Sequence, residues 1–364
     1  MEKLNSIKIN ELPSKTWSWL KLNSSQFQIP SNFSQKEISV QNLGEAVAFH
    51  TEELSFQNNK NTNQTLKDSS LEYLIKSSSK MQNVITISKD TKNPVLIFLD
   101  YTEKEFSSSV QKIIVKENVS AEIIFVSTSK NASSGASVIS TEVFAEQNSN
   151  VKITKIQILS SNFSQIDDTT FFCSDNSSAS LFLVQLGAKE IFSSVHANLN
   201  GYKSKFYSDT AYFCKENQNY DFNHVCHQIA QKTDCKMYIN GALKDFAKKT
   251  YRGTIDFKNG CKGSTGDEQE KVLVLSKETT NNSIPVILCD EEDVQGEHGC
   301  SIGRLSNEIL FYMESRGIDA KSAEKIIARA IINAVLSKIP QDEKVLKLSE
   351  DFLNKIFGGE NESI

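Results

Sequence analysis

Three similar units between residues 117 and 184 decide the fold: ENVSAEIIF from Glu117, QNSNVKITKI from Gln147 and DNSSASLFLV from Asp175. Each unit joins a polar turn rich in Asn and Ser to a run rich in Val, Ile and Phe, which is the composition of a β-strand. Related units follow later in the chain: LNGYKSKFYS from Leu199, QKTDCKMYIN from Gln231 and KNGCKGSTG from Lys258. A spacing of roughly 24 to 32 residues is typical of the stacked coils of a β-solenoid.

Strand-like runs continue from Val84 to Cys289, which predicts one large β region. Regular strands separated by turns also occur in β-sandwiches, so the repeat alone leaves two architectures open. Asn-Gly pairs, the signal of tight hairpins, are few in this region, which favours the solenoid. We expect a mainly β protein, with a partly helical N-terminal module at residues 1–83, a solenoid core at 84–300 and a helical C-terminal module at 301–364.

The helical C-terminal part is predicted from caps and periodicity. Ser306 or Asn307 can cap a first helix that ends at Gly317, and Asp319 can cap a second. The second helix carries apolar residues at three- and four-residue steps, which predicts its buried stripe: Ala323, Ile326, Ile327, Ala330, Ile331, Ala334 and Val335. A third, short helix is expected at residues 351–357.

Composition excludes several classes of function. The 364 residues carry a formal net charge of -5 and show no basic stripe, so nucleic acid is not an expected partner. No run approaches the roughly 18 apolar residues of a membrane helix, and the start MEKLNSIKIN lacks the apolar core of a signal peptide. We therefore expect a cytoplasmic protein, in which the seven cysteines are free thiols.

Few residues offer chemistry. No Walker phosphate loop, nucleophile elbow, HExxH or CxxC motif is present, so no enzyme class is indicated. His224, Cys226 and His227 are metal-capable, but on a strand only the first two share a face. Glu297, His298 and Cys300 place a carboxylate, an imidazole and a thiol within four residues, a mixture that iron accepts. The alternative, which the residues alone favour, is a structural histidine that caps the following helix.

The C-terminal sequence HGCSIGRLSNEILFYMESRGID, together with Tyr251-Arg252-Gly253-Thr254-Ile255, resembles the SufB/SufD family. These proteins are paired scaffold subunits of the SUF iron-sulfur cluster assembly machinery. A Trp-bearing segment from Pro13 to Leu22 is similar to the N-terminal motif of SufD. The segment 267–271 lacks the cysteine of SufB, and glycine follows His298, so the chain resembles SufD more than SufB. Glu297 resembles the SufB form, and Cys300 departs from the usual alanine.

The resemblance implies a right-handed parallel β-helix and a non-catalytic scaffold. It implies a SufB-like partner that pairs through the β-helix and a SufC-like ATPase, and it allows a homodimer when the partner is missing. His298 is then the candidate ligand of a transient iron-sulfur cluster at the interface, with Cys300 and Glu297 as weaker candidates and no stably bound cofactor. The implied ATPase-docking residues are Phe311, Tyr312, Ser315, Arg316, Gly317 and Ile318. The alternatives are an interaction solenoid without a cluster role and a β-helix enzyme acting on carbohydrate.

Overall fold

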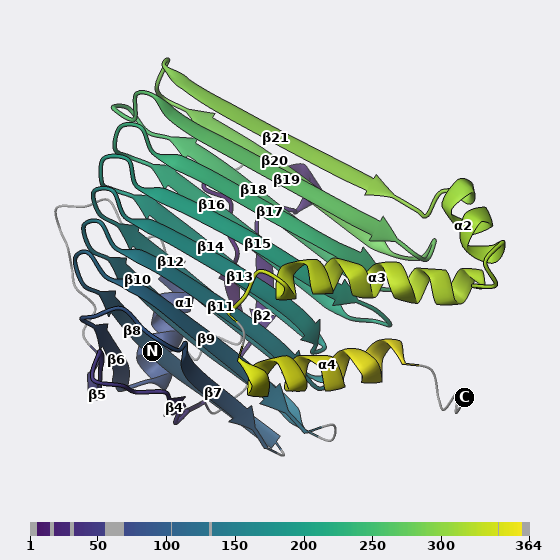
Figure 1. The fold of residues 1–364 in the computed structure, drawn as a ribbon, viewed down its shortest axis with the longest axis horizontal. Coiled ribbons are helices and arrows are strands. Elements are labelled where there is room, and N and C mark those ends of the chain that lie inside the picture. Colours follow the sequence, from purple (N-terminus) through teal and green to yellow (C-terminus); the bar gives the residue numbers. More distant parts are fainter. Residues whose placement is uncertain are drawn as a thin grey trace.

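The structure, a computed structural model, describes residues 6–14, 18–29, 33–54, 69–102, 104–130, 133–340 and 342–358. An elongated β-solenoid occupies most of the chain, with helices along one flank and short strands and a helix on the opposite side (Figure 1). This architecture confirms the expected mainly β solenoid fold. Among the described residues, no helix is long and apolar enough to cross a membrane.

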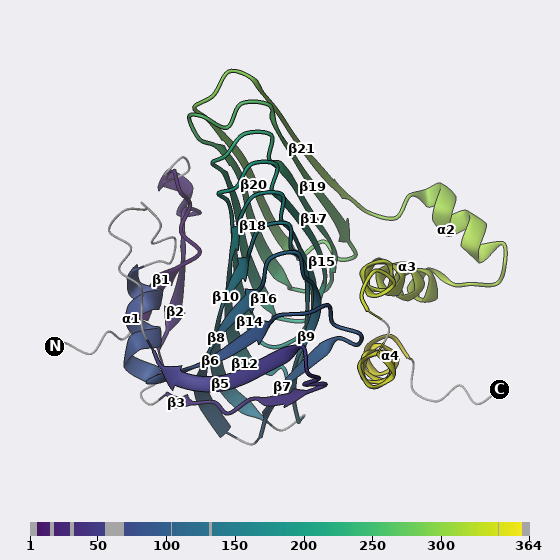
Figure 2. The same ribbon diagram turned by 60° about the vertical axis from the view of Figure 1, so that its left-hand side comes forward.

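Two parallel sheets face each other along the solenoid (Figure 2). The chain alternates between them, so each strand of the solenoid pairs in parallel with the strand two places further on. The even sheet contains β6 (Met81–Ile87), β8 (Lys104–Val115), β10 (Ser134–Ala145), β12 (Asn162–Cys173), β14 (Glu190–Leu199), β16 (Asn219–Gln228), β18 (Lys248–Phe257) and β20 (Thr280–Cys289). The odd sheet contains β7 (Val95–Tyr101), β9 (Ser120–Ser129), β11 (Asn150–Leu159), β13 (Ser178–Gly187), β15 (Lys205–Cys214), β17 (Asp234–Leu243), β19 (Ser264–Val274) and β21 (Val294–Gly303).

The repeated Asn of the first three sequence units explains the turns that precede three strands of the odd sheet. Asn118, Asn148 and Asn176 precede β9, β11 and β13 with φ values of 61°, 55° and 55°. Asn tolerates this left-handed conformation better than most residues with a side chain. The amide Nδ2 of Asn148 also donates to Asn118 Oδ1 in the neighbouring coil at 2.9 Å. Polar turns therefore stack on one another just as the strands do.

The N-terminal end of the solenoid is covered by the chain itself. β5 (Val47–Glu53) pairs antiparallel with β6, and β4 (Ser39–Gln41) pairs antiparallel with β7. β3 (Ser34–Gln35) adds a short pairing with β8. The described part of this region contains one α-helix, α1 (Ser69–Ser78), and one 3-10 turn, η1 (Ser18–Leu20). The described N-terminal residues are thus more strand-rich than the partly helical module that we expected.

Three helices follow β21. α2 (Asn307–Glu314) begins at Ser306, whose Oγ accepts from Ile309 N at 3.2 Å. α3 (Ala320–Leu336) begins at Asp319, whose Oδ1 accepts from Ser322 N at 2.7 Å. Both caps were predicted correctly. Figure 2 shows α3 and α4 (Glu343–Phe357) side by side against the odd sheet, where their apolar residues form a second core with its outer face.

Two details of the helices differ from expectation. The buried residues of α3 are Ala323, Ala328, Ile332, Val335 and Leu336, whereas Ile326 of the predicted stripe is 49% exposed. Apolar residues occupy more than one row of this helix, so periodicity could not choose the row that packs. α4 begins at Glu343 instead of residue 351, because Asp342 caps it by accepting from Val345 N at 3.1 Å.

Candidate functional site

Each of the two strands of the last coil has one edge that is not hydrogen-bonded to another strand of the described chain. β20 ends the even sheet and β21 ends the odd sheet, and no described strand pairs beyond either of them. Both strands are ten residues long, so each presents unpaired backbone N–H and C=O groups. We refer to the exposed edges of β20 and β21 as the open end. It is the place where a strand of another chain could extend either sheet.

His298 and Cys300 lie on β21 and face the solenoid axis. They pair with Glu268 and Glu270 of β19, which are 2% and 3% exposed in the lumen. Paired residues of a parallel sheet share a face, and no coil follows β21, so His298 and Cys300 line the lumen but are exposed. Glu297 directly precedes His298 in the sequence and therefore alternates to the outer face. The structure thus brings His298 and Cys300 to one face and separates Glu297 from both.

Cys300 contacts a buried ion pair one coil below. Its thiol donates to Glu270 Oε2 at 3.4 Å, and Glu270 forms an ion pair with Lys249, whose side chain is fully buried. Lys249 Nζ also donates to the Asn282 carbonyl oxygen at 3.3 Å. Burial raises the pKa of Cys300, and the charge of Glu270 raises it further. The thiol therefore holds its proton more firmly than an ordinary cysteine.

Glu268, one coil below His298, is a second buried carboxyl group. Burial raises its pKa to about 8, so at pH 7 it is largely protonated. A Cβ at Gly253 would lie 2.0 Å from Glu268 Oε1 and 2.6 Å from Tyr251 Oη. Only glycine leaves room for both groups, which explains the glycine of the Tyr251-Arg252-Gly253 motif. Sequence reasoning did not single out Glu268 or Lys249, because their inward direction follows only from the strand register.

The described residues contain no complete metal site. No group of three or more His, Cys, Asp or Glu side chains among them is arranged to hold an ion. His298 and Cys300 supply an imidazole and a thiol, two donors that iron accepts, on one exposed face. Their role as ligands stays a prediction, which requires that a second molecule complete the set.

The His224 to His227 run divides between two faces, as alternation predicts. His224 and Cys226 are buried in the lumen, and His227 points outward, where its Nδ1 lies 2.7 Å from Asp256 Oδ2. Burial lowers the pKa of His224 to about 3, so this imidazole is neutral. The run therefore does not gather its three side chains into one site.

The predicted ATPase-docking residues lie on and just after α2, which has no buried residue. Phe311 and Tyr312 are 74% and 60% exposed. The Arg316 guanidinium lies 5.4 Å from the centre of the Tyr312 ring, and Ser315 Oγ donates to the Tyr312 carbonyl oxygen at 2.7 Å. Gly317 has a φ of 83°, the left-handed stop that we expected, and Ile318 N donates to the Met313 carbonyl oxygen at 3.0 Å. The helix thus offers an ordered, uncovered aromatic surface; its docking role stays a prediction.

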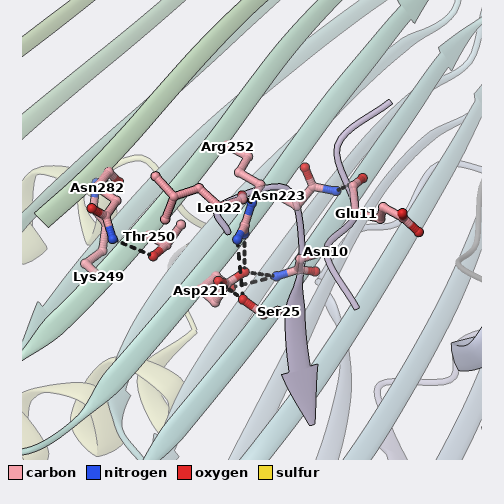
Figure 3. A network of polar contacts seen from close by, with 10 residues as sticks. All are labelled: Asn10, Glu11, Leu22, Ser25, Asp221, Asn223, Lys249, Thr250, Arg252 and Asn282. Carbon is pink, nitrogen blue, oxygen red and sulfur yellow. Dashed lines mark hydrogen bonds and ion pairs between the residues drawn. The ribbon is translucent and has the colours of Figure 1, made fainter. Parts of the chain in front are cut away.

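Arg252 anchors an N-terminal hairpin on the outer face of the even sheet (Figure 3). The hairpin pairs β1 (Ser6–Ile9) antiparallel with β2 (Ser25–Gln28). Arg252 Nε donates to the Leu22 carbonyl oxygen and Nη1 to Asp221 Oδ1, both at 2.6 Å. Asp221 Oδ1 also accepts from Asn10 Nδ2 at 2.6 Å, and its Oδ2 accepts from Ser25 Oγ. Trp17, one of the two tryptophans in the segment from Pro13 to Leu22, lies outside the described residues.

Comparison with known proteins shows which protein family the chain is similar to. The profile described as "SUF system FeS cluster assembly, SufBD core domain" matches residues 98–331, which is more than half of the chain. The SufD iron-sulfur cluster assembly protein of Bacillus subtilis is 30% identical over 101 residues, which cover 28% of this chain and 23% of that protein. SufBD family proteins of Staphylococcus epidermidis and Staphylococcus saprophyticus are each 24% identical over 204 residues, or 56% of this chain and 44% of theirs. The matched stretches therefore span less than half the length of these relatives.

Proposed function

The chain belongs to the SufBD core domain family of the SUF system of iron-sulfur cluster assembly, and we propose that it is a SufD-like, non-catalytic scaffold subunit. In this proposal it pairs with a SufB-like subunit through the open end and binds a SufC-like ATPase through its C-terminal helices. The cluster under assembly is the cargo of the complex. The observation that carries the proposal is the exposed, axis-facing position of His298 on an uncovered strand.

The uncovered strands support pairing with another solenoid. Native proteins rarely leave long, regular edge strands open to solvent, because such edges template aggregation. β20 and β21 are both uncovered, and together they form the complete cross-section of one coil. A partner built from similar coils can meet both edges at once, whereas a single peptide strand can cover only one. The SufB-like subunit is such a partner.

The donor set supports a shared cargo site. His298 and Cys300 face the axis at the open end, so a partner's last coil would bring its own side chains toward them. Two donors of this chain and further donors of the partner can then surround iron, which takes both nitrogen and sulfur ligands. Because Cys300 must lose its proton to bind, a basic group of the partner or a water molecule would take that proton, and the bound metal would lower the pKa of the thiol.

The position of α2 supports the contact with the ATPase. The chain has no phosphate-binding loop of its own, so any dependence on ATP must come from a partner. α2 begins four residues after β21 ends at Gly303. A movement of the ATPase against Phe311 and Tyr312 would therefore act on the strand that carries His298.

Co-purification tests the proposal. The tagged chain is co-expressed with the SufB-type and SufC-type subunits of the same organism, and the eluate is analysed by native mass spectrometry. We expect one complex that contains all three subunits and forms iron-sulfur clusters when iron, sulfide and ATP are supplied. Recovery of the chain alone, with both other subunits expressed and folded, would contradict the proposal and favour a solenoid with another partner.

A further inference from the structure

The N-terminal hairpin crosses the even sheet strand by strand and reaches the open end. Phe27 packs edge-on against Phe192 of β14, with ring centroids 5.7 Å apart. Further along, Asn10 binds Asp221 of β16, and Arg252 of β18 binds the Leu22 carbonyl oxygen. The last contacts are with β20, where two hairpin leucines, Leu12 and Leu22, pack on Ile284, Val286 and Leu288. The described residues at this end of the hairpin, 12–14 and 18–22, therefore lie at the edge strand of the sheet.

This end of the hairpin exposes large apolar side chains. Trp19 is 75% exposed and Leu20 is 44% exposed, whereas Leu12 is 3% exposed. Trp19 has the largest exposed fraction of any large apolar residue among those described. Exposed tryptophans that sit on rigid supports are common anchors of protein interfaces, because a single indole buries a large area at little cost in entropy.

The support beneath this end of the hairpin is rigid. Arg252 is 1% exposed, and its guanidinium bridges the hairpin to Asp221 through two hydrogen bonds of 2.6 Å. The Asp221 carboxylate also accepts hydrogen bonds from both arms of the hairpin, at Oδ1 from Asn10 and at Oδ2 from Ser25. A buried charge pair whose hydrogen bonds are all made holds its elements in one arrangement. The two arms of the hairpin are thus fixed to the even sheet at Asn10, Leu22 and Ser25 before any partner binds.

We infer that Trp19 and Leu20 form part of the partner-binding surface of the open end, and that their occupant is the last coil of a second SufBD-family solenoid. This inference rests on the proposed function, from which it takes the partner. A coil that pairs with the edge of β20 comes to lie next to this end of the hairpin, because Leu12 and Leu22 pack on β20 itself. The hairpin lies outside the matched core residues 98–331, so the surface extends the contact beyond the core domain.

Photo-crosslinking tests the inference in the complex described above. p-Benzoylphenylalanine replaces Trp19 in one variant, Ile302 of β21 in a second and Tyr73 of α1 in a third. Ile302 is 53% exposed at the open end, and Tyr73 is 40% exposed on α1, which packs over β8, β10 and β12 near the covered end. After irradiation, the crosslinked peptides are identified by mass spectrometry.

We expect positions 19 and 302 to crosslink to peptides from the C-terminal coils of the SufB-type subunit, and position 73 to give no such product. Crosslinking from 302 but not from 19, or from 19 only within its own chain, would overturn the inference and leave the proposed function intact. Absence of partner crosslinks from both positions would overturn the proposed function as well. A crosslink from 19 to the SufC-type ATPase would assign this end of the hairpin to another surface and also overturn the inference.

Binding affinity gives a second, independent readout. Trp19→Ala should weaken binding of the SufB-type subunit at least tenfold, as expected for the loss of a central aromatic anchor. The matched control Tyr73→Ala should change the affinity less than twofold. Because Trp19 is exposed, both variants should keep the unfolding midpoint of the parent chain, which a thermal scan checks. An unchanged affinity of Trp19→Ala would contradict the inference.

Discussion

The two ends of the solenoid are built differently. At the N-terminal end the chain covers its own first strands with β4 and β5, which run antiparallel to the strands beneath them. At the C-terminal end β20 and β21 are uncovered, and no residue of β21 is buried. One end thus closes the fold, and the other retains unpaired edges that another chain can use.

Buried polar groups occur along much of the lumen. In the first coils Ile85, Ile97 and Ile113 are fully buried, and so is Gln111, while further along Lys155 forms a buried ion pair with Asp167. In the last coils the lumen contains the Lys249 and Glu270 ion pair and other polar side chains. Buried polar and charged groups cost stability unless they are paired, so a chain keeps them where they serve another purpose. The comparison teaches that the two ends differ chiefly in their strand edges: the covered end closes the fold, and the open end leaves edges that another chain can pair with.

The largest expected effect is at the open end. His298→Ala should abolish cluster formation in the reconstituted three-subunit complex, because it removes the candidate imidazole ligand. The isolated chain should keep its stability within about 0.5 kcal/mol, since the side chain is exposed. Cluster yield is measured by absorbance and iron content, and complex formation by gel filtration. Unchanged cluster yield in an intact complex would remove His298 from the cargo site.

A matched pair of substitutions compares the two ends directly. Ile85→Ala, in the fully buried lumen of the first coil, should lower the free energy of unfolding by about 3 kcal/mol. Ile287→Ala, at the partly buried equivalent of the last coil, should lower it by about 1 kcal/mol. Urea unfolding of the isolated chain measures both. Equal losses would show that the two ends contribute equally to stability.

The polar lumen predicts a dependence on pH. The buried His224, which packs edge-on against Phe222 and Tyr251, has a pKa of about 3 in the folded chain. A histidine whose folded pKa lies below its unfolded value of about 6.5 favours folding above that pH, and this contribution is lost as the pH falls. Between pH 7 and pH 5 the chain should lose about 2 kcal/mol relative to His224→Phe. The free energy of unfolding of both proteins is measured by urea unfolding at each pH. If it changed with pH in the same way in both, His224 would not be the source of the pH dependence.

The smallest effect concerns the helix beyond the open end. Phe311→Asp should weaken binding of the SufC-type ATPase about tenfold, because it places a charge on an exposed aromatic surface. Phe246→Asp is the control, since Phe246 is also exposed, at 59%, but lies in the turn between β17 and β18. Surface plasmon resonance measures both affinities. Equal binding by the two variants would show that α2 is not the contact.

The parts that sequence predicts well are those set by local chemistry. The turn-and-strand repeat indicated the coils because Asn118, Asn148 and Asn176 adopt a conformation that few other residues tolerate. Caps at Ser306 and Asp319 are equally local. The early start of α4 was missed, and the buried face of α3 was misplaced because several apolar rows compete.

The candidate site was only partly accessible from sequence. His298 stood out through the resemblance and its flexible neighbours, but its axis-facing direction depends on the register of β21 with β19. The same holds for Glu268 and Lys249. The hairpin anchor lies furthest from any local signal, because Arg252 and Leu22 are 230 positions apart. Interactions of that kind are visible only once the whole solenoid is assembled.

That separation has a consequence for the time course of synthesis. A ribosome adds on the order of 5 to 20 residues per second, so Arg252 emerges roughly 10 to 50 s after Leu22. Folding can begin at the covered end and continue coil by coil as the chain is made, since each coil contacts its neighbours. The hairpin, although made first, can find its full set of contacts only when β16, β18 and β20 exist. Its docking therefore marks the completion of the solenoid, and Trp19 takes its place beside β20 only in a finished subunit.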